Sequence, residues 1–394
     1  MIAESHNANE MVWDGDCSRG FTMRRVSILV LAVLMISACA PVVAQPAAAT
    51  GQKAAPAGNS VAVSSAQPAT YTVLVGSEDT SQGIDAEAYF PATLHIHVGD
   101  TVDWKSNSKE IHTITFLGGT TPVPQLLIPV PNGPQGAMMP NPEVAFPTAP
   151  DSGRYDGTGF LNSGIVSTGE GFPSDFQVTF TEPGTYEYQC IVHEEELMKG
   201  TIVVEDAGAT VQSPQDAEAA GRQEMADLMA KAPEMIGAAL AEVAPDTTNA
   251  DGSVTHHVLV GYSSGQIDLM SFFPKDIEVR PGDTVVWDFA SQNVAPHTIT
   301  FLNGAEDPQS FLLTPATDGG QPTLMINPDV AMPQNADQPL TDQGIYNSGL
   351  IDPAAPGPHS FSLKIGDVTG ELPYVCLLHD ESGMRGTLTV PAAN

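Results

Sequence analysis

The chain has 394 residues, of which 42% are hydrophobic, so it is long enough for two domains that each bury a core. Its 14 basic and 47 acidic residues give a formal net charge of -33. This charge argues against nucleic acid as a partner, because phosphates would be repelled, and it favours a basic partner or simply solubility.

The N-terminal stretch has the features of an export signal. Two arginines precede an apolar run over residues 26–35, which is too short to span a bilayer and has the length of a signal-peptide core. Because Met23 offers a later start, residues 1–22 are interpreted as an upstream extension and residues 23–38 as the signal peptide.

A lipid anchor is predicted directly after this signal. The sequence Ile-Ser-Ala-Cys at residues 36–39 resembles the bacterial lipobox, in which cleavage before the cysteine leaves a lipid on its sulfur, so Cys39 is a candidate lipidation site. The alternative is ordinary cleavage after Ala44. Both alternatives predict an extracytoplasmic protein, and lipidation would hold it at a membrane, in the periplasm or on the outer face of the cell membrane. Residues 39–68 are rich in Ala, Pro, Gln and Ser without periodicity and are interpreted as a flexible tether.

The remainder of the chain is a duplication. Six short motifs of the first half recur in the same order in the second half, 183 to 186 residues later. The paired ranges are 73–76 with 258–261, 90–91 with 273–274, 99–104 with 282–287, 112–117 with 297–302, 141–147 with 327–333, and 162–164 with 347–349. This pattern predicts two copies of one domain, at residues 69–206 and 253–394.

Each copy has the pattern of an all-β domain. Short segments rich in Val, Ile, Thr and Phe are separated by Gly, Pro and Asp turns, which is typical of the strands of a sandwich. The clearest predicted strands cover residues 94–98, 176–180 and 201–204 in the first copy, and 277–280, 361–365 and 387–390 in the second.

The acidic segment between the copies, residues 207–252, has a helical pattern. Apolar side chains recur at helical spacing between residues 217 and 243, and Pro233 should divide this stretch into two short amphipathic helices. We interpret the methionine-containing stripe as a packing face against one or both domains, with a copper-binding role as the alternative. Its members are Met225, Leu228, Met229, Met235, Ile236, Ala239 and Leu240.

Each copy ends with the same set of metal-ligand residue types. Cys, His and Met recur as Cys-x2-His-x4-Met at residues 190–198 and 376–384. Upstream, each copy has one histidine in an identical His-Thr-Ile-Thr-Phe context, at His112 and His297. One thiolate, two imidazoles and a weak axial thioether are the ligand set of blue-copper electron-transfer sites.

These motifs, together with Gly-Asp-Thr-Val-x-Trp in both copies, resemble the cupredoxins of the plastocyanin/azurin-like type. The resemblance covers residues 69–206 and 253–394, and it implies an all-β protein made of two Greek-key cupredoxin sandwiches joined by the short helical linker. It also implies two type 1 copper ions per chain. Their ligands would be His112, Cys190, His193 and Met198 in the first copy, and His297, Cys376, His379 and Met384 in the second.

The residue after the first ligand histidine departs from the family pattern. Many relatives have Asn there, whereas this chain has Thr113 and Thr298, which puts the reduction potential in doubt but not the metal. The backbone N–H of each threonine is still expected to reach the cysteine sulfur. Asn162 and Asn347 are interpreted as turn formers, with support of the metal ligands as the alternative.

The cysteines are expected to bind metal instead of pairing. With one cysteine per domain, an internal disulfide is impossible, and a ligand role disfavours a bond between Cys190 and Cys376.

The resemblance implies electron transfer, not catalysis. In multicopper oxidases, histidines flank the cysteine ligand, whereas the flanking residues here are Gln189 and Ile191 in one copy and Val375 and Leu377 in the other. The alternatives are a copper-dependent oxidoreductase, similar to nitrite reductase or a multicopper oxidase with an unrecognised second copper site, and a copper storage or delivery protein.

The surroundings of the second histidine ligand suggest a partner. In this family, that histidine usually reaches the surface as the port for electrons. Carboxylates follow it at residues 194–196 and 380–381 and would steer a basic redox partner, such as a cytochrome. His95 and His97 share one strand face, where a further metal site is conceivable, although ordinary strand residues are the simpler interpretation.

Overall fold

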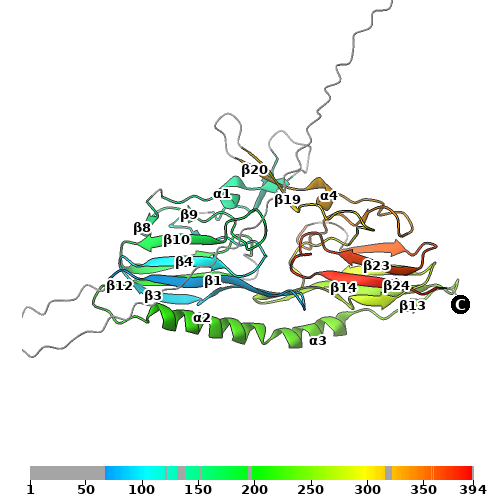
Figure 1. Ribbon diagram of the computed structural model, residues 1–394, viewed down its shortest axis with the longest axis horizontal. Helices are drawn as coiled ribbons and strands as arrows, with labels where there is room; N and C mark the ends of the chain where they lie inside the picture. Colours follow the sequence, from blue (N-terminus) through cyan, green and yellow to red (C-terminus); the bar gives the residue numbers. More distant parts are fainter. Residues whose placement is uncertain are drawn as a thin grey trace, which may run out of the picture. The chain divides into compact units, whose positions relative to one another are not determined.

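The computed structural model describes residues 67–119, 122–130, 138–150, 152–193, 198–315, 322–355, 357 and 359–392, all of which belong to one compact unit, Ala62–Asn394 (Figure 1). The predicted upstream extension, signal peptide and Cys39 lie outside the described residues, as does the predicted tether apart from its last two residues. None of the helices in the described ranges combines the length and apolar character needed to cross a membrane.

The two copies contain matching series of short strands. The first copy contains β1 (Thr70–Asp79), β2 (Ile84–Phe90), β3 (Thr93–His97), β4 (Thr101–Ser106), β5 (Thr115–Phe116), β6 (Leu127–Pro129), β7 (Met138–Pro140), β8 (Arg154–Tyr155), β9 (Leu161–Asn162), β10 (Asp175–Phe180), β11 (Gly184–Gln189) and β12 (Lys199–Glu205). The second copy contains β14 (Val254–Ser264), β15 (Ile267–Phe273), β16 (Asp276–Glu278), β17 (Thr284–Phe289), β18 (Thr300–Phe301), β19 (Phe311–Thr314), β20 (Thr323–Ile326), β21 (Tyr346–Asn347), β22 (Ser360–Lys364), β23 (Gly370–Val375) and β24 (Arg385–Val390). β13 (Thr247–Thr248) lies in the segment between the copies and pairs with β14. The six clearest predicted strands correspond to β3, β10, β12, β16, β22 and β24.

Each copy is a β-sandwich, as predicted. In the first, β2, β1, β4, β10 and β8 form one layer, and β3, β12, β11, β5 and β9 form the other. In the second, β15, β14, β17 and β22 lie opposite β16, β24, β23, β18 and β21. The alternating burial of β12 and β24 shows why these segments form half-buried strands, because every second side chain enters the core.

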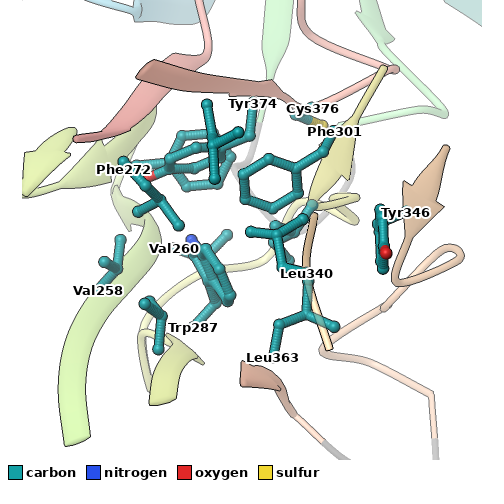
Figure 2. Close-up of a cluster of buried hydrophobic side chains, with 14 of the residues drawn as sticks. Val258, Val260, Phe272, Trp287, Phe301, Leu340, Tyr346, Leu363, Tyr374 and Cys376 are labelled. Carbon is teal, nitrogen blue, oxygen red and sulfur yellow. The ribbon is translucent and has the colours of Figure 1, made fainter. Parts of the chain in front are cut away.

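Aromatic side chains fill the space between the two layers of each sandwich. Trp104 contacts the ring of Tyr188 with centroids 5.4 Å apart, and Trp287 contacts Tyr374 in the same way at 5.5 Å. Figure 2 shows the core of the second copy, in which Cys376 lies at the edge, next to Phe301. Cys190 and Cys376, the two predicted ligand cysteines, are therefore part of the cores at the points where β11 and β23 end.

The two sandwiches share one sheet. β2 of the first copy pairs antiparallel with β15 of the second, with Asp85 opposite Asp268, and the N–H of Glu87 donates to the carbonyl of Gln266 at 2.9 Å. The sheet order β22-β17-β14-β15-β2-β1-β4-β10-β8 therefore runs through both copies. The prediction of two sandwiches joined by a helical linker was incomplete, because the local sequence pattern contains no signal for strand pairing between domains.

The predicted linker helices are present as α2 (Pro214–Met229) and α3 (Ala232–Glu242), in addition to the single-turn helices α1 (Pro142–Ala145) and α4 (Pro328–Ala331). Ser213 caps α2 by accepting the N–H of Asp216 at 3.2 Å, and Pro233 lies in the first turn of α3, where proline is tolerated. As Figure 1 shows, α2 lies along β1 and β2, and α3 continues along β14 and β15.

The methionine-containing stripe packs against the shared sheet, as predicted. Met225, Leu228 and Met229 contact the cluster that contains Phe90, and most of the remaining members pack against the second copy. Leu240, which was assigned to the same face, is an exception, because half of its surface is exposed.

Candidate metal centres

The ligand residues of the first site come from the ends of neighbouring strands. His112 precedes β5 and forms a backbone bridge with Val166, and Cys190 directly follows β11, which pairs with β5. The turn after Cys190 is closed by two hydrogen bonds: the N–H of Cys190 donates to the carbonyl of Met198 at 3.0 Å, and the N–H of Met198 donates to the carbonyl of His193 at 3.3 Å. The sandwich thus brings together residues that are far apart in the sequence.

The side chains of His112, Cys190 and His193 form a buried group whose ligand atoms all lie within 4.8 Å of one another. Cys190 Sγ is 3.7 Å from His193 Nδ1. His112 Nε2 lies 3.0 Å from Ser108 Oγ, and among the described residues its buried Nδ1 has no hydrogen-bond partner. This nitrogen is therefore available to a metal ion.

The second copy repeats this arrangement with His297, Cys376 and His379. Cys376 Sγ lies 3.8 Å from His297 Nδ1 and 3.4 Å from His379 Nδ1, and His297 Nε2 lies 3.3 Å from Asn293 Oδ1. A metal ion about 2.0–2.3 Å from two nitrogens and a sulfur in one plane would hold these atoms roughly 3.5–3.8 Å apart. The sulfur–nitrogen distances of 3.7 Å in the first copy and 3.8 and 3.4 Å in the second lie close to this requirement, so each group suits a single ion. The 3.0 Å between His297 Nδ1 and His379 Nδ1 is shorter, so these two imidazoles must separate slightly around an ion.

The thiols are buried but receive hydrogen bonds. The N–H of Thr113 donates to Cys190 Sγ and the N–H of Thr298 donates to Cys376 Sγ, both at 3.3 Å, which confirms the expected backbone contact. Burial raises the pKa of each thiol to about 11, and these N–H groups partly oppose the rise. Metal binding must therefore displace a proton from each cysteine.

The ligand imidazoles are held in their neutral form. Burial lowers the pKa of His112 to about 3 and that of His379 to about 4, and it also lowers the pKa values of His193 and His297. A neutral imidazole offers a lone pair, so at neutral pH all four nitrogen ligands are ready to bind a metal.

The methionines of the motif are placed at the same points in both loops. Met198 and Met384 are fully buried, and each carbonyl accepts the N–H of its cysteine at 3.0 Å. This places both residues beside the ligand groups. Coordination through their sulfur atoms stays a prediction.

A chain of buried hydrogen bonds holds the first site in shape. Thr113 Oγ1 accepts the N–H of Ile191 at 2.9 Å and lies 3.0 Å from Thr115 Oγ1, which donates to Asn162 Oδ1 at 2.8 Å. The amide of Asn162 in turn donates to the carbonyls of Glu143 and Val144 at 3.0 and 2.9 Å. The loop that carries the cysteine is thereby tied to the strand that carries the first histidine.

The second copy has the same network through Thr298, Thr300 and Asn347. The amide of Asn347 donates to the carbonyls of Asp329 and Val330 at 3.0 and 3.1 Å. The hydrogen bonds of Asn162 and Asn347 fit the alternative interpretation, support of the metal ligands, because both side chains are completely buried and link α1 and α4 to the threonines beside the cysteines. Asn347 also has the expected turn role, since its Oδ1 accepts the N–H of Gly349 at 2.9 Å. A sequence signal was present, since both Asn-Ser-Gly motifs recur at the repeat offset.

Two glycines leave room for the first ligand histidines. Gly76 has φ +71°, and a Cβ there would lie 2.6 Å from His112 Nε2; Gly261 has φ +62°, and a Cβ there would lie 2.5 Å from His297 Nε2. This explains why Val-Leu-Val-Gly recurs in both copies, a role that the sequence interpretation missed.

A buried carboxylate distinguishes the first site from the second. Glu87 Oε2 lies 3.5 Å from His112 Nδ1 and 3.2 Å from His193 Nδ1, and the side chain is fully buried. Burial raises the pKa of Glu87 well above its ordinary value, and Asp85 adds to the rise. The repeat places Met270 at the equivalent position of the second copy, so the two sites have different electrostatic surroundings.

The second histidine of each site does not reach the surface. His193 is 7% exposed and His379 is 5% exposed. Instead, His193 Nε2 lies 3.9 Å from Glu110 Oε1, and His379 Nε2 lies 3.6 Å from Glu110 Oε2. The expectation that these histidines reach the surface is therefore wrong, because both imidazoles are buried and end at Glu110, a residue of the first copy. Of the carboxylates predicted to surround the ports, residues 194–196 lie outside the described residues.

His95 and His97 pair with separate acids. His95 Nδ1 lies 3.2 Å from Glu205, and His97 Nδ1 lies 3.7 Å from Asp100. They lie on one face of β3, but the structure gives each its own partner. Cys190 and Cys376 are both free thiols.

A comparison with protein families supports copper as the metal. Residues 77–205 match the family described as copper binding proteins of the plastocyanin/azurin family. The matched segment contains His112, Cys190, His193 and Met198. Together with the two buried groups, this match supports one copper site in each copy.

Comparisons with solved structures identify amicyanins. A reduced amicyanin variant is 22% identical, with 34% of this chain and 82% of the amicyanin covered and a TM-score of 0.20. An oxidised amicyanin variant is 21% identical, with the same coverage and TM-score. From the family match and the site geometry, residues 77–205 of this chain are a copper-binding domain of the plastocyanin/azurin family, a cupredoxin.

Proposed function

We propose that this chain is an extracytoplasmic electron carrier that holds one type 1 copper ion in each of its two β-sandwiches. The ligands are His112, Cys190, His193 and Met198 in the first copy, and His297, Cys376, His379 and Met384 in the second. The observation that carries the proposal is the occurrence of two buried Cys–His–His groups at matching positions.

Bound copper supplies one-electron chemistry through its Cu(I) and Cu(II) states. The protein contributes a fixed set of ligand positions, because backbone hydrogen bonds hold both ends of each cysteine loop. In addition, the hydroxyl oxygens of Thr113 and Thr298 each accept an N–H of the loop. The backbone N–H of each threonine donates to the cysteine sulfur. Because this ligand set is buried in the core, the ligands cannot rearrange widely when the charge of the ion changes. This rigidity favours electron transfer over metal delivery, which needs exchangeable ligands.

The test is copper loading of the purified chain. We expect two copper ions per chain, intense visible absorption that disappears on reduction, and only type 1 signals in the paramagnetic resonance spectrum. Cys190→Ser and Cys376→Ser should each remove one centre, and the double variant should remove all colour. Copper uptake without strong visible absorption, or rapid release of copper to a weak chelator, would contradict the proposal.

We also propose that the protein is held at a membrane through a lipid on Cys39 and exchanges electrons with a basic redox protein such as a cytochrome. The lipobox-like sequence and the net charge of -33 support these two points. The mass of the mature protein and that of a Cys39→Ser variant should differ by the lipid. The rate of reduction by a basic cytochrome should fall as salt is raised.

A further inference from the structure

The two candidate copper sites face one another across a single carboxylate. Through Nδ1, His193 approaches Cys190 Sγ at 3.7 Å and His379 approaches Cys376 Sγ at 3.4 Å. Their opposite nitrogens, the Nε2 atoms, point at the two oxygens of Glu110, at 3.9 and 3.6 Å. The side chain that would serve as an electron port in each domain therefore ends at the same residue.

We propose that Glu110 couples the two ligand imidazoles, so that electrons pass between the two centres inside one chain along His193, Glu110 and His379. In each transfer one centre loses an electron and the other gains it, and no bond forms or breaks. The inference rests on the proposed function and adds that the two centres act as a coupled pair instead of two independent carriers.

The path between the sites is enclosed. The side chains of His193, Glu110 and His379 are 9%, 12% and 7% exposed. Distances of 3.6 and 3.9 Å are longer than good hydrogen bonds, but they are too short for a water molecule to lie between the two groups. The three side chains are thus adjacent, with protein and not solvent around them.

Several contacts fix the two copies in this relation. β2 pairs with β15, and Lys109 Nζ donates to the carbonyl of Glu381 at 2.9 Å. A Cβ on Gly383 would lie 1.9 Å from the carbonyl oxygen of Thr80, so the second copper loop packs tightly on the first copy. Glu110 Oε1 also accepts the N–H of Ile111 at 3.0 Å, which orients the carboxylate.

Glu110 occurs in one copy only, unlike the ligand residues, which recur in both. Glu110 lies two residues before His112, and the equivalent residue two before His297 is Ala295. The Glu110 carboxylate contacts both histidines, and a carboxylate at position 295 would place a second negative charge beside it. Glu110 is thus a positioning residue that belongs to the pair of sites.

The kinetic test uses copper-loaded full chain. A short reductive pulse should be followed by redistribution between the centres at a rate that does not depend on protein concentration, with reference spectra from Cys190→Ser and Cys376→Ser. Glu110→Ala should slow this redistribution several-fold, and Glu110→Gln, which keeps the contacts, should slow it less. Glu187→Ala, which removes an exposed carboxylate from β11, should leave the rate unchanged.

A structural readout comes from nitrogen NMR of the Cu(I)-loaded or metal-free chain. Glu110→Ala should shift the Nε2 resonances of both His193 and His379, while those of His112 and His297 stay in place. If only one histidine responds, or if Glu110→Ala and Glu187→Ala redistribute electrons equally fast, the coupling role is overturned. If the wild-type chain lacks two type 1 spectra, the proposed function fails instead, so the two failures are distinguishable.

Discussion

Asn162 and Asn347 use their polar atoms to connect the short helices α1 and α4 to the threonines beside the cysteines. Both side chains are fully buried, so removal of the amide would leave carbonyl groups and a threonine hydroxyl without their partners in an apolar interior. Such groups cost more than the lost hydrogen bonds alone, because they cannot return to water.

Asn162→Ala should lower the free energy of unfolding by about 2–4 kcal/mol. It should also shift the sulfur-to-copper absorption of the first site only, because Thr113 and Thr115 lose their support. Urea unfolding and the visible spectrum of a Cys376→Ser background measure the two effects. Gln223→Ala, on an exposed part of α2, is the control and should change stability by less than about 0.5 kcal/mol. An unchanged Asn162→Ala protein would show that the network is dispensable.

Glu87 is the residue that most clearly makes the two copper sites unequal. A negative charge beside the metal-facing nitrogens of His112 and His193 favours Cu(II), whereas Met270 offers no charge at the second site. In the metal-free chain burial favours the protonated carboxyl, and a bound cation reverses this preference.

Glu87→Met should therefore raise the reduction potential of the first copper by on the order of 100 mV. Redox titration in a Cys376→Ser background, where only the first site binds copper, measures the change. The same substitution in a Cys190→Ser background should leave the second site unaffected. A potential that stays the same in the first background would mean that Glu87 does not carry charge in the loaded protein.

The sequence predicted these sites only in part, and the reason is physical. Cys-x2-His-x4-Met lies within one loop, so its spacing alone indicates a shared ligand group. Glu87 and Glu110 lie on other segments and lack a repeated partner, and only the fold brings them to the ligands. The strands were predictable because alternating burial leaves a period of two, whereas the β2–β15 pair leaves no local trace.

At the scale of elements, α2 packs so closely on the shared sheet that position 221 has no room for a side chain larger than that of glycine. A Cβ on Gly221 would lie 2.6 Å from Pro91 N and 2.7 Å from Phe90 C, both backbone atoms. Gly237 in α3 is exposed and has nothing within 4 Å of its Cβ position. The two glycines therefore have the same helix propensity but opposite packing environments.

Gly221→Ala should destabilise the chain by about 1–3 kcal/mol, because α2 must move away from β2. Gly237→Ala should stabilise it by about 0.5–1 kcal/mol, because alanine favours the helix and meets no obstacle. Thermal or urea unfolding of the two variants makes a matched pair. Equal effects of both substitutions would show that α2 does not depend on this close contact.

At the scale of the whole described unit, the seam between the copies contains buried acids. Asp85 and Asp268 lie opposite one another where β2 meets β15, and both are almost completely buried. Burial raises the pKa of Asp268 to about 7, with Glu110 adding to the rise and Ser263 opposing it. Burial also raises the pKa of Asp85 well above its ordinary value. The acids at this seam therefore favour protonation in the folded state.

This protonation gives the seam a defined pH dependence. An unfolded aspartate has a pKa of about 3.9, so the folded chain binds more protons than the unfolded chain between about pH 4 and pH 7. The contribution of Asp268 to stability is thus fully present below about pH 4 and is lost as the pH rises through about 7. His112 and His379 act in the opposite direction below about pH 6.5, because their folded pKa values are lowered. A single stability curve would mix the two effects, and a comparison of variants separates them.

Asp268→Asn should therefore stabilise the metal-free chain relative to the wild type at pH 8, by on the order of 2 kcal/mol, and by much less at pH 5. The amide keeps the size of the side chain but cannot ionise. The folded variant therefore never buries the negative charge that Asp268 carries at high pH. Urea unfolding at the two pH values measures the difference, and Asp175→Asn, at the exposed first residue of β10, provides the control. A stabilisation of the same size at both pH values would mean that Asp268 gains no proton when the two sandwiches form their common sheet.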